Sequence, residues 1–251
     1  MSILRCLSAG LICVIALPCV ARAGALEDIS EHTKKGRTVF LVLTDAAARD
    51  LKAARAVAHA AQKQTPNSAV VELNRSDPAQ RTAVARFRVA AAPVPLVLCI
   101  ASNGFAVGAV RPAAKGATDR LVGMVPSPGK AEYLSVLSQK RVAAVVFSRA
   151  SMSEQSPLFI EISKTVKDPK SNMTAVLVDL DDARERKWVN QWKLDPKKIT
   201  RPLVVFVNPK GQILGKLEGA PKAAQMLAMS KKVIRGCQDP KCKDPNCRHG
   251  K

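Results

Sequence analysis

The sequence predicts an α/β protein made of two tandem modules, each with a central mixed sheet flanked by helices. Three observations lead to this fold class. Apolar segments recur in the same order at a spacing of about 105 residues, which indicates a duplicated unit. Within each copy, strand-like runs alternate with helical stretches, as in α/β domains. The two ends of the chain differ from the rest, because residues 1–23 resemble an export signal and residues 236–251 form a cysteine-rich basic tail.

The N-terminal segment has the three parts of a signal peptide. Arg5 supplies the positive charge, residues 7–20 are an apolar run of 14 residues, and residues 21–23 (Ala-Arg-Ala) form a cleavage site. A membrane-spanning helix needs about 20 apolar residues, so this run predicts export rather than an anchor. We therefore expect a signal peptide at 1–23, cleavage after Ala23, a periplasmic or secreted protein, and no transmembrane segment in the mature chain.

The first module is expected at residues 24–140. A buried apolar strand comes first, followed by a helix whose apolar residues recur at helical spacing. A second strand, a short helix, a loop ending in proline, an apolar strand, an Asn-Gly turn and a further strand follow, and a helix closes the module. The expected strands and longer helices are Val39–Leu43, Ala46–Gln64, Val70–Leu73, Phe105–Val110 and Ala131–Gln139.

The second module, expected at residues 141–235, repeats this order. Ala144–Ser148 matches the first strand and Thr174–Val178 matches the second, both at an offset of 105 residues. Pro202–Gly211 matches Pro95–Gly104 at an offset of 107, because the loop before the proline is two residues longer. We place the boundary between the modules near Lys140. The other elements expected in this copy are a first helix at about Ser153–Val166, a strand at Gln212–Leu217 and a closing helix at Pro221–Ile234.

The order β-α-β-α-β-β-α, with a proline that begins an apolar strand and a glycine turn nine residues later, resembles the thioredoxin-like fold superfamily. The resemblance covers nearly the whole mature chain as two tandem domains. In that family the proline is cis and its loop faces the active site. The matching steps are Val94-Pro95 and Arg201-Pro202. The resemblance therefore implies cis bonds at both steps and a binding surface at both loops.

Both copies lack the cysteines with which the family performs redox chemistry. A Cys-x-x-Cys pair would stand at the start of the first helix, where a low thiol pKa makes thiolate available. The corresponding segments are Thr44–Lys52 and Ser148–Ser156, and neither contains cysteine. Cys99 lies within an apolar strand and is expected in the core. We assign no catalytic residue and expect no enzyme; any activity would be of the thiol-disulfide oxidoreductase kind.

The charge of the protein restricts its partners. The formal net charge is +20, and it falls to +18 when the signal peptide with Arg5 and Arg22 is removed. A long-range positive field attracts polyanions. Anionic envelope polymers or lipid headgroups fit an exported protein, whereas nucleic acid is not expected, because there are only nine aromatic residues and no recognised nucleic-acid motif. A generic solvated basic surface is the other interpretation.

The tail at 236–251 allows three interpretations. Cys237, Cys242, Cys247 and His249 form a Cys₃His set that suits Zn²⁺ or Cu(I), although the four-residue gaps between cysteines are long for a zinc site. The basic surroundings also favour thiolate and disulfide chemistry, with an odd cysteine available for an intermolecular bond. The third interpretation is a disordered extension of little function.

Two hypotheses of function follow from the sequence. The first is an exported, non-catalytic binding or scaffold protein whose partner is a protein or peptide. The alternative is a thiol-disulfide or metal-handling protein that acts through its tail, with Zn or Cu as the metal and no cofactor in the modules.

Overall fold

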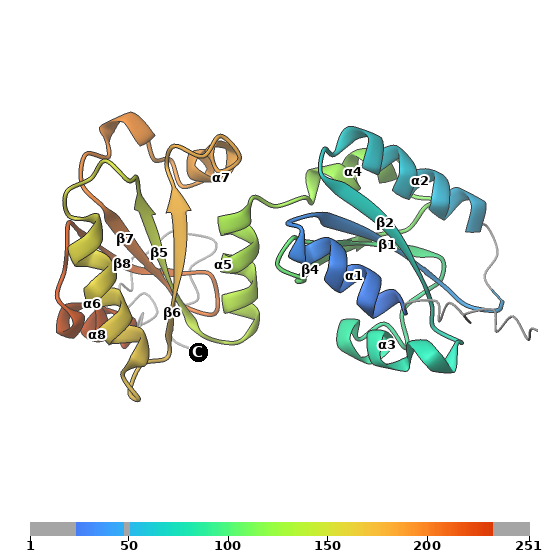
Figure 1. The fold of residues 1–251 in the computed structure, drawn as a ribbon, viewed down its shortest axis with the longest axis horizontal. Helices are drawn as coiled ribbons and strands as arrows, with labels where there is room; N and C mark the ends of the chain where they lie inside the picture. Colours follow the sequence, from blue (N-terminus) through green and yellow to red (C-terminus); the bar gives the residue numbers. More distant parts are fainter. Residues whose placement is uncertain (1–23, 48–50, 233–251) are drawn as a thin grey trace, which may run out of the picture.

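The computed structural model describes residues 24–47 and 51–232, which form two sheets with helices on both faces (Figure 1). The expected signal peptide and the tail residues Cys237, Cys242, Cys247 and His249 lie outside the described residues. None of the described helices is long and apolar enough to cross a membrane.

Within the described residues, module 1 has four α-helices, four strands and a short 3-10 helix at Pro78–Gln80. Its α-helices and strands, in chain order, are α1 (Ala25–Lys34), β1 (Thr38–Thr44), α2 (Leu51–Gln64), β2 (Ser68–Asn74), α3 (Arg81–Phe87), β3 (Leu96–Ile100), β4 (Ala106–Val110) and α4 (Ala117–Gly123). Module 2 repeats the series as α5 (Pro128–Ser138), β5 (Val142–Ser148), α6 (Gln155–Lys167), β6 (Met173–Asp179), α7 (Arg186–Gln191), β7 (Leu203–Val207), β8 (Ile213–Glu218) and α8 (Ala223–Ser230).

The two sheets have the same topology. Their strand orders are β2-β1-β3-β4 and β6-β5-β7-β8. The first two strands of each module pair in parallel, and the remaining pairs are antiparallel. The predicted class is thus confirmed: each module is a thioredoxin-like mixed sheet with helices on both sides.

The central strands explain why each module needs two layers of helices. All seven residues of β1 and all seven of β5 are buried, so both faces of these strands require cover. In module 1, α1 and α3 cover one face of the sheet, and α2 and α4 cover the other. Module 2 is built in the same way from α5 with α7 and from α6 with α8.

The helix α5 corrects one expectation. The sequence suggested that a helix at Ala131–Gln139 closes the first module. Its side chains instead pack with the second sheet, where Val136 is buried beside Tyr133 and Leu137, and Figure 1 shows α5 next to β6. The closing helix of module 1 is α4. The assignment of α5 to the first module is therefore wrong; it is the counterpart of α1, which the sequence analysis missed.

The strand registers also correct one offset of the repeat. Thr38 in β1 pairs with the first residue of β2, and Val142 in β5 pairs with the first residue of β6. Thr38 and Val142 are therefore equivalent, which gives an offset of 104 for the first strand instead of 105. The physical reason is that the connection between the first and second strands is one residue longer in module 2.

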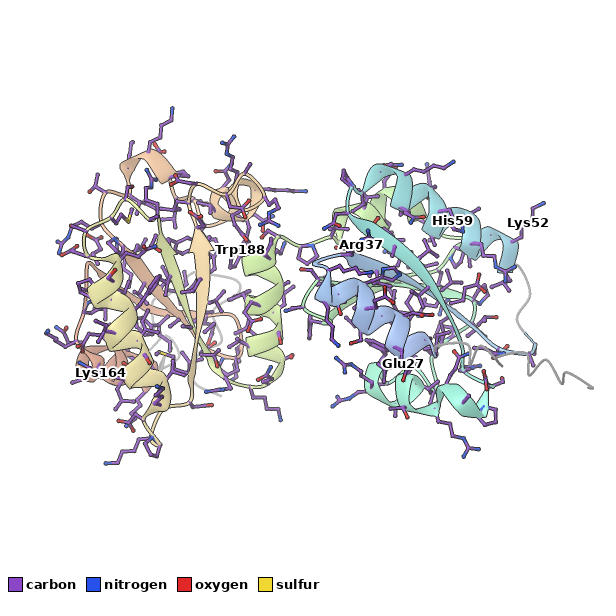
Figure 2. All side chains as sticks on the ribbon, in the orientation of Figure 1. Glu27, Arg37, Lys52, His59, Lys164 and Trp188 are labelled. Atoms are coloured by element: carbon purple, nitrogen blue, oxygen red, sulfur yellow. The ribbon has the colours of Figure 1, made fainter. Side chains whose placement is uncertain are left out.

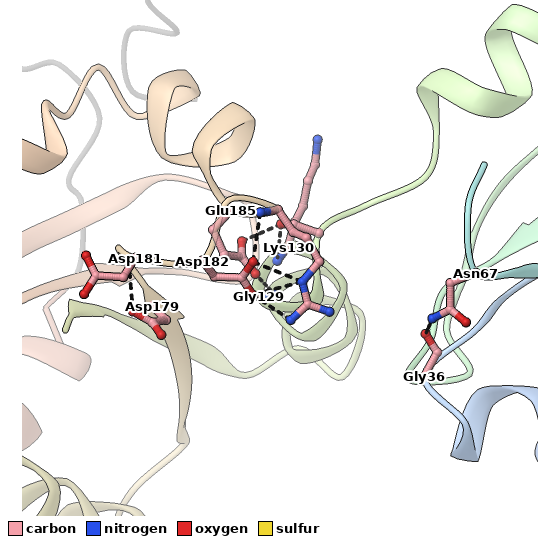
Figure 3. Close-up of polar contacts among 10 residues, drawn as sticks. Gly36, Asn67, Gly129, Lys130, Asp179, Asp181, Asp182 and Glu185 are labelled. Atoms are coloured by element: carbon pink, nitrogen blue, oxygen red, sulfur yellow. Dashed lines mark hydrogen bonds and ion pairs between the residues drawn. The ribbon is translucent and has the colours of Figure 1, made fainter. Parts of the chain in front are cut away.

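Small contacts repeat along with the strands. Asn67 Nδ2 donates to the carbonyl oxygen of Gly36 at 3.1 Å, and Asn172 Nδ2 donates to that of Lys140 at 3.3 Å; Figure 3 shows the first of these bonds. In both cases an asparagine before the second strand ties down the turn before the first. The acceptors Gly36 and Lys140 both have left-handed φ angles, 70° and 58°.

Candidate functional site

The candidate site lies where the first strand of each module ends, because redox thioredoxin-like proteins carry their cysteines at this corner. In module 1 the first residue after β1 is Asp45. Its Oδ1 accepts the backbone N–H of Ala47 at 3.0 Å, which closes a tight turn at the end of the strand. In module 2 the equivalent residue after β5 is Arg149.

An arginine in module 1 joins three loops at this corner. The Arg75 guanidinium follows β2 and donates to Asp45 Oδ2 from Nε at 3.1 Å and from Nη2 at 2.7 Å. Its Nη1 donates to the carbonyl oxygens of Ala90 and Ala92, at 3.1 and 2.6 Å. We call this set of four residues the module 1 clamp. It fixes the loop that leads to Pro95 against the ends of β1 and β2.

Module 2 has a clamp made with different residues. Arg149 Nη2 donates to the carbonyl oxygen of Pro196 at 2.6 Å, and its Nε lies 3.7 Å from Asp181 Oδ1. Nε is buried and makes no hydrogen bond within the described chain, so the contact with Asp181 is an ion pair at longer range. The module 2 clamp (Arg149, Asp181 and Pro196) therefore also joins three loops.

The two clamps have opposite polarity. In module 1 the acid follows the first strand and the base follows the second; in module 2 the base comes first. The backbone N–H of Arg75 donates to Thr44 O, and that of Leu180 donates to Ser148 O, so these two positions are equivalent. An uncharged leucine thus stands where module 1 has its arginine, and the acid of module 2 is the next residue, Asp181.

The proline loops differ between the modules. Val94-Pro95 is a cis peptide bond, as the resemblance implied. Arg201-Pro202 is not among the cis bonds of the described chain, so that expectation is wrong. Pro202 is instead tied to the neighbouring strand, because its carbonyl oxygen accepts the N–H of Gly219 at 2.7 Å.

In module 2 an ion pair joins the proline loop to the start of α6. Arg201 donates from Nε and Nη2 to the two carboxylate oxygens of Glu154, each at 2.8 Å. Glu154 occupies the N-cap position of α6, and its side chain makes no capping hydrogen bond there. The hydrogen bond from Arg201 lowers the pKa of Glu154 below its usual 4.5, and the pair raises the pKa of Arg201. Among the described residues of module 1, Val94 makes no equivalent contact and packs against the core.

The one cysteine in the described part of the chain belongs to neither clamp. Cys99 is fully buried in β3, opposite Phe40 of β1. Burial raises the pKa of its thiol from 9.0 to about 12, because the thiolate would lose its hydration. The prediction that Cys99 belongs to the core is confirmed.

The carboxylates at the end of β6 and directly after it accept backbone N–H groups within turns. Asp179 Oδ1 accepts the N–H of Asp181, and Asp182 Oδ1 accepts that of Arg184, both at 2.9 Å. The Arg184 side chain also bonds to Asp182 and lowers its pKa. No group of His, Cys, Asp and Glu in the described ranges has the geometry of a metal site.

Two other conspicuous residues have local roles. His59, on the exposed face of α2 (Figure 2), has its Nδ1 3.3 Å from Gln62 Oε1. Trp188 is 4% exposed and packs in module 2 against Tyr133, Phe147 and Trp192, with ring centroids 5.5 to 6.4 Å apart. Neither residue lies at the clamps.

A groove runs beside the clamp of module 1, along the free edge of β2. Its volume is about 1050 Å³, and its walls come from α1, β2 and α2. The lining residues that bear on the site are Asp28, His32, Thr44, Asp45, Arg55 and Asp77.

The sequence analysis named the proline loops but missed the clamps. It found Val94, Pro95, Arg201 and Pro202 from the family pattern alone. The available signal for the clamps was a charged residue directly after each first strand, Asp45 and Arg149. Their partners lie 30 and 32 residues further along the chain and are not part of the family pattern.

Comparison with known proteins found only distant similarities, all to solved structures. No family model and no curated protein matches the sequence. Among solved structures, human ERp44 in its zinc-bound form is 12% identical with a TM-score of 0.37, over 83% of this chain and 56% of that one. The first two thioredoxin domains of Saccharomyces cerevisiae Eps1p are 11% identical with a TM-score of 0.31, over 84% and 97%. The N-terminal domain of AhpF from Enterococcus faecalis is 10% identical with a TM-score of 0.29, over 81% and 96%.

This chain spans just over half the length of the ERp44 structure that it matches. The strand order and strand directions of the two modules define the fold independently of these similarities. The described chain consists of two tandem thioredoxin-like modules.

Proposed function

We propose that this chain is an exported, non-catalytic protein that binds a protein or peptide partner or acts as a scaffold. The clamps carry the proposal. At each corner where the fold would hold a redox-active thiol, an arginine ties together three loops. An ion pair in this position holds loops in place but has no electrons to exchange, so it favours a rigid binding surface over catalysis.

Of the two proline loops, the one in module 1 is the better candidate for a docking surface. Its clamp holds Ala90 and Ala92 in place, and Val94-Pro95 follows at the end of that loop. In module 2 the bidentate pair of Arg201 with Glu154 already occupies the approach to Pro202. A partner that docks there has to displace the pair first. We therefore assign the docking role mainly to Val94 and Pro95.

The strong positive charge would add a second, less specific affinity. A formal charge of +18 after export attracts anionic envelope polymers or lipid headgroups at low ionic strength. This attraction would concentrate the protein at the cell envelope. Binding to vesicles that contain anionic lipid should therefore weaken steeply as salt is raised.

Insulin reduction tests the non-catalytic assignment. The purified protein and a variant with Cys237, Cys242 and Cys247 changed to serine are assayed beside a dithiol oxidoreductase as positive control. We expect no turnover by either form. Sustained turnover by the serine variant would contradict the proposal, because the only thiol left in the mature chain is the buried Cys99.

A second candidate function is favoured by the position of the thiols. Apart from the buried Cys99, the thiols of the mature chain all lie in the tail sequence, at Cys237, Cys242 and Cys247, and His249 follows two residues later. In this alternative the tail exchanges disulfides or binds Zn²⁺ or Cu(I), and the two modules only carry it.

Native mass spectrometry separates the two candidates. A bound metal or a defined disulfide that disappears when residues 236–251 are deleted, with the circular dichroism spectrum unchanged, would support the tail function. A mass equal to that of the free, fully reduced mature chain in the native preparation would argue against it. Cys99 gives an internal control, since it should stay reduced in both forms.

A further inference from the structure

The outer edge of the module 2 sheet is formed by β6, which pairs on one side only, with β5. The direction of its backbone groups follows from two bonds at the ends of the ladder. Val142 N–H donates to Asn172 O, and Leu180 N–H donates to Ser148 O. In a parallel pair, alternate residues of a strand bond to the same neighbour. The even-numbered residues of β6 therefore bond to β5, and the odd-numbered ones direct their N–H and C=O groups outward.

The four outward-facing residues of β6 differ in the hydrogen bonds that their backbone groups already make. At the end of the strand, the carbonyl oxygen of Asp179 accepts the N–H of Asp182 at 3.2 Å. Met173, at the start, is capped, because its carbonyl oxygen accepts Arg141 Nη2 at 2.7 Å and its N–H lies 3.3 Å from Ser171 Oγ. No such bond is made by the outward backbone groups of Ala175 and Leu177 within the described residues. These two positions give a short template with the hydrogen-bond spacing of a β-strand.

The same edge in module 1 is guarded by charge. Glu72, which is equivalent to Leu177 by register, accepts two hydrogen bonds from Arg55, at 2.6 and 2.9 Å. Charged side chains on an edge strand hinder the addition of another strand. Module 2 instead has a leucine whose exposed fraction is 55%. The two edges thus differ at their centre, where one carries an ion pair and the other an exposed apolar side chain.

A groove of about 440 Å³ accompanies this edge between β6 and α5. Its lining residues are Pro128, Gly129, Glu132, Ala175, Leu177, Asp179, Asp182 and Glu185. Four of these eight are carboxylates and none is basic, in a protein whose net charge is +20. Figure 3 shows Asp182 and Glu185 beside Gly129 at the start of α5, and Asp179 next to Asp181 further along the same side.

Two of the four carboxylates are available for a ligand. Glu185 is 3% exposed and accepts the N–H of Gly129 at 2.7 Å, and Asp182 pairs with Arg184 at 2.6 Å. Glu132 and Asp179 are exposed and form no ion pair within the described chain. Each accepts one hydrogen bond, Glu132 Oε2 from Asn103 Nδ2 at 3.4 Å and Asp179 Oδ1 from the backbone N–H of Asp181 at 2.9 Å, and keeps its negative charge. The groove therefore has two uncompensated negative charges beside an apolar side chain and a row of outward backbone groups.

We propose that the β6 edge of module 2 binds an extended, cationic segment of a partner polypeptide by strand addition. The segment pairs its backbone with Ala175 and Leu177, packs an apolar side chain on Leu177, and places lysine or arginine near Glu132 and Asp179. This inference rests on the proposed binding role and gives it a second surface, remote in sequence from Val94-Pro95.

Peptide binding tests the surface directly. The probe is a fluorescein-labelled heptapeptide of alternating lysine and valine, and binding is followed by fluorescence anisotropy. We expect Leu177→Lys to raise the dissociation constant at least about tenfold, because it brings a like charge to the centre of the edge. The matched control is Ile213→Lys. Ile213 is 57% exposed on β8, at the opposite edge of the same sheet, and its change should leave affinity within about twofold.

The charge requirement is tested separately. Glu132→Gln combined with Asp179→Asn should weaken binding about three- to tenfold and flatten its dependence on sodium chloride. A heptapeptide with glutamate in place of lysine should not bind measurably. If both peptides bind equally well, or if the double variant behaves as the parent protein does, the proposed cationic ligand is wrong.

Amide exchange distinguishes strand addition from simple electrostatic attraction. In the free protein the outward amides of Ala175 and Leu177 should exchange faster than the ladder amides of Val176 and Val178. Saturating peptide should slow the outward pair at least about tenfold and leave the ladder pair nearly unchanged. Binding without this protection would overturn the strand-addition geometry.

Two further outcomes would show that something other than a partner polypeptide occupies the β6 edge. A dimer in sedimentation that Leu177→Lys dissolves would mean that a second copy of the chain covers the edge. A gain in peptide affinity when Lys241 and Lys243 are changed to glutamine would mean that the tail of the chain competes for it. The insulin assay stays independent of all these measurements, so failure of the β6 proposal and failure of the non-catalytic role can be told apart.

Discussion

The clamps of the two modules make the same connection with opposite charges. In module 1 the carboxylate of Asp45 follows the first strand and the arginine follows the second; in module 2 Arg149 follows the first strand and Asp181 comes after the second. The two clamps differ in burial: the side chains of Arg75 and Asp45 are 25% and 11% exposed, whereas Asp181 is 63% exposed. The comparison teaches that both modules bridge three loops at this corner, with an arginine and a carboxylate at different positions in each.

The modules also carry separate natural probes. The one described thiol, Cys99, lies in module 1, and both tryptophans, Trp188 and Trp192, lie in module 2. Thiol labelling therefore reports the opening of module 1, and tryptophan fluorescence reports the unfolding of module 2. The stability of each module can therefore be measured with its own probe.

The largest expected effect is the protection of Cys99. In a variant with the three tail cysteines changed to serine, Cys99 should react with a maleimide at pH 8 at least about 10³-fold more slowly than an exposed thiol, because burial and a pKa of about 12 both suppress the thiolate. The rate should rise to that of the unfolded chain in denaturant. Fast labelling of the native protein would show that module 1 opens readily.

The next largest effect should follow removal of the module 1 arginine. Arg75→Ala leaves the nearly buried Asp45 without its partner and frees the loop at Ala90 and Ala92, so we expect module 1 to lose about 3 kcal/mol of unfolding free energy. The measurement is Cys99 labelling as a function of urea in the tail-serine background. Tryptophan fluorescence should show module 2 nearly unchanged.

Placing the residues of the module 2 clamp in module 1 tests whether the bridge itself supplies the stability. The triple change Asp45→Arg, Arg75→Leu and Ser76→Asp installs the module 2 pattern in module 1. We expect it to recover most of the stability that Arg75→Ala loses, because the three loops are bridged again. A transplant that is less stable than Arg75→Ala would show that the two corners are not equivalent in geometry.

A smaller effect is expected in module 2. Arg149→Ala removes one hydrogen bond to Pro196 and an ion pair with the well-exposed Asp181, so module 2 should lose about 1 kcal/mol. Tryptophan fluorescence in urea measures this loss. A loss as large as that of Arg75→Ala would contradict the link between burial and the strength of the clamp.

The smallest effect concerns the exposed pair of Glu154 and Arg201. Carbon-13 NMR titration should place the pKa of the Glu154 carboxyl below 4.5, and Arg201→Gln should return it toward that value. Because the folded-state pKa is lowered, the pair contributes to stability above about pH 4.5, and this contribution disappears as the pH falls through the lowered value. In module 1 the residue before the proline is Val94, so no such pair joins the proline loop to α2 among the described residues.

The sequence was informative wherever a property is local or repeated. Apolar runs located the strands, the spacing of the runs revealed the duplication, and the position of Cys99 inside one run placed it in the core. The cis bond at Val94-Pro95 followed from the family pattern, and the same pattern failed at Arg201-Pro202. A backbone pattern cannot show that Arg201 pairs with Glu154, 47 residues earlier in the chain.

The clamps and the module to which α5 belongs could not be predicted for a related reason, because both depend on contacts between residues far apart in the sequence. The bond between Arg75 and Asp45 exists only because parallel pairing brings the ends of β1 and β2 to the same edge of the sheet. The helix α5 has apolar residues that suit either neighbouring sheet. In the structure it packs on the second sheet, and Glu185, 56 positions further along the chain, accepts the N–H of Gly129 at its start.

The bond between Glu185 and Gly129 also sets an order of events during synthesis. Module 1 has its last helix by Gly123, before α5 has been made. The N-terminal end of α5, in contrast, receives the Glu185 carboxylate through Ser127 and Gly129 only after the ribosome has added the segment that leads into α7. Domains generally fold as units as they emerge. The nascent chain should therefore pass through a stage in which the first half is complete and α5 awaits the rest of the second.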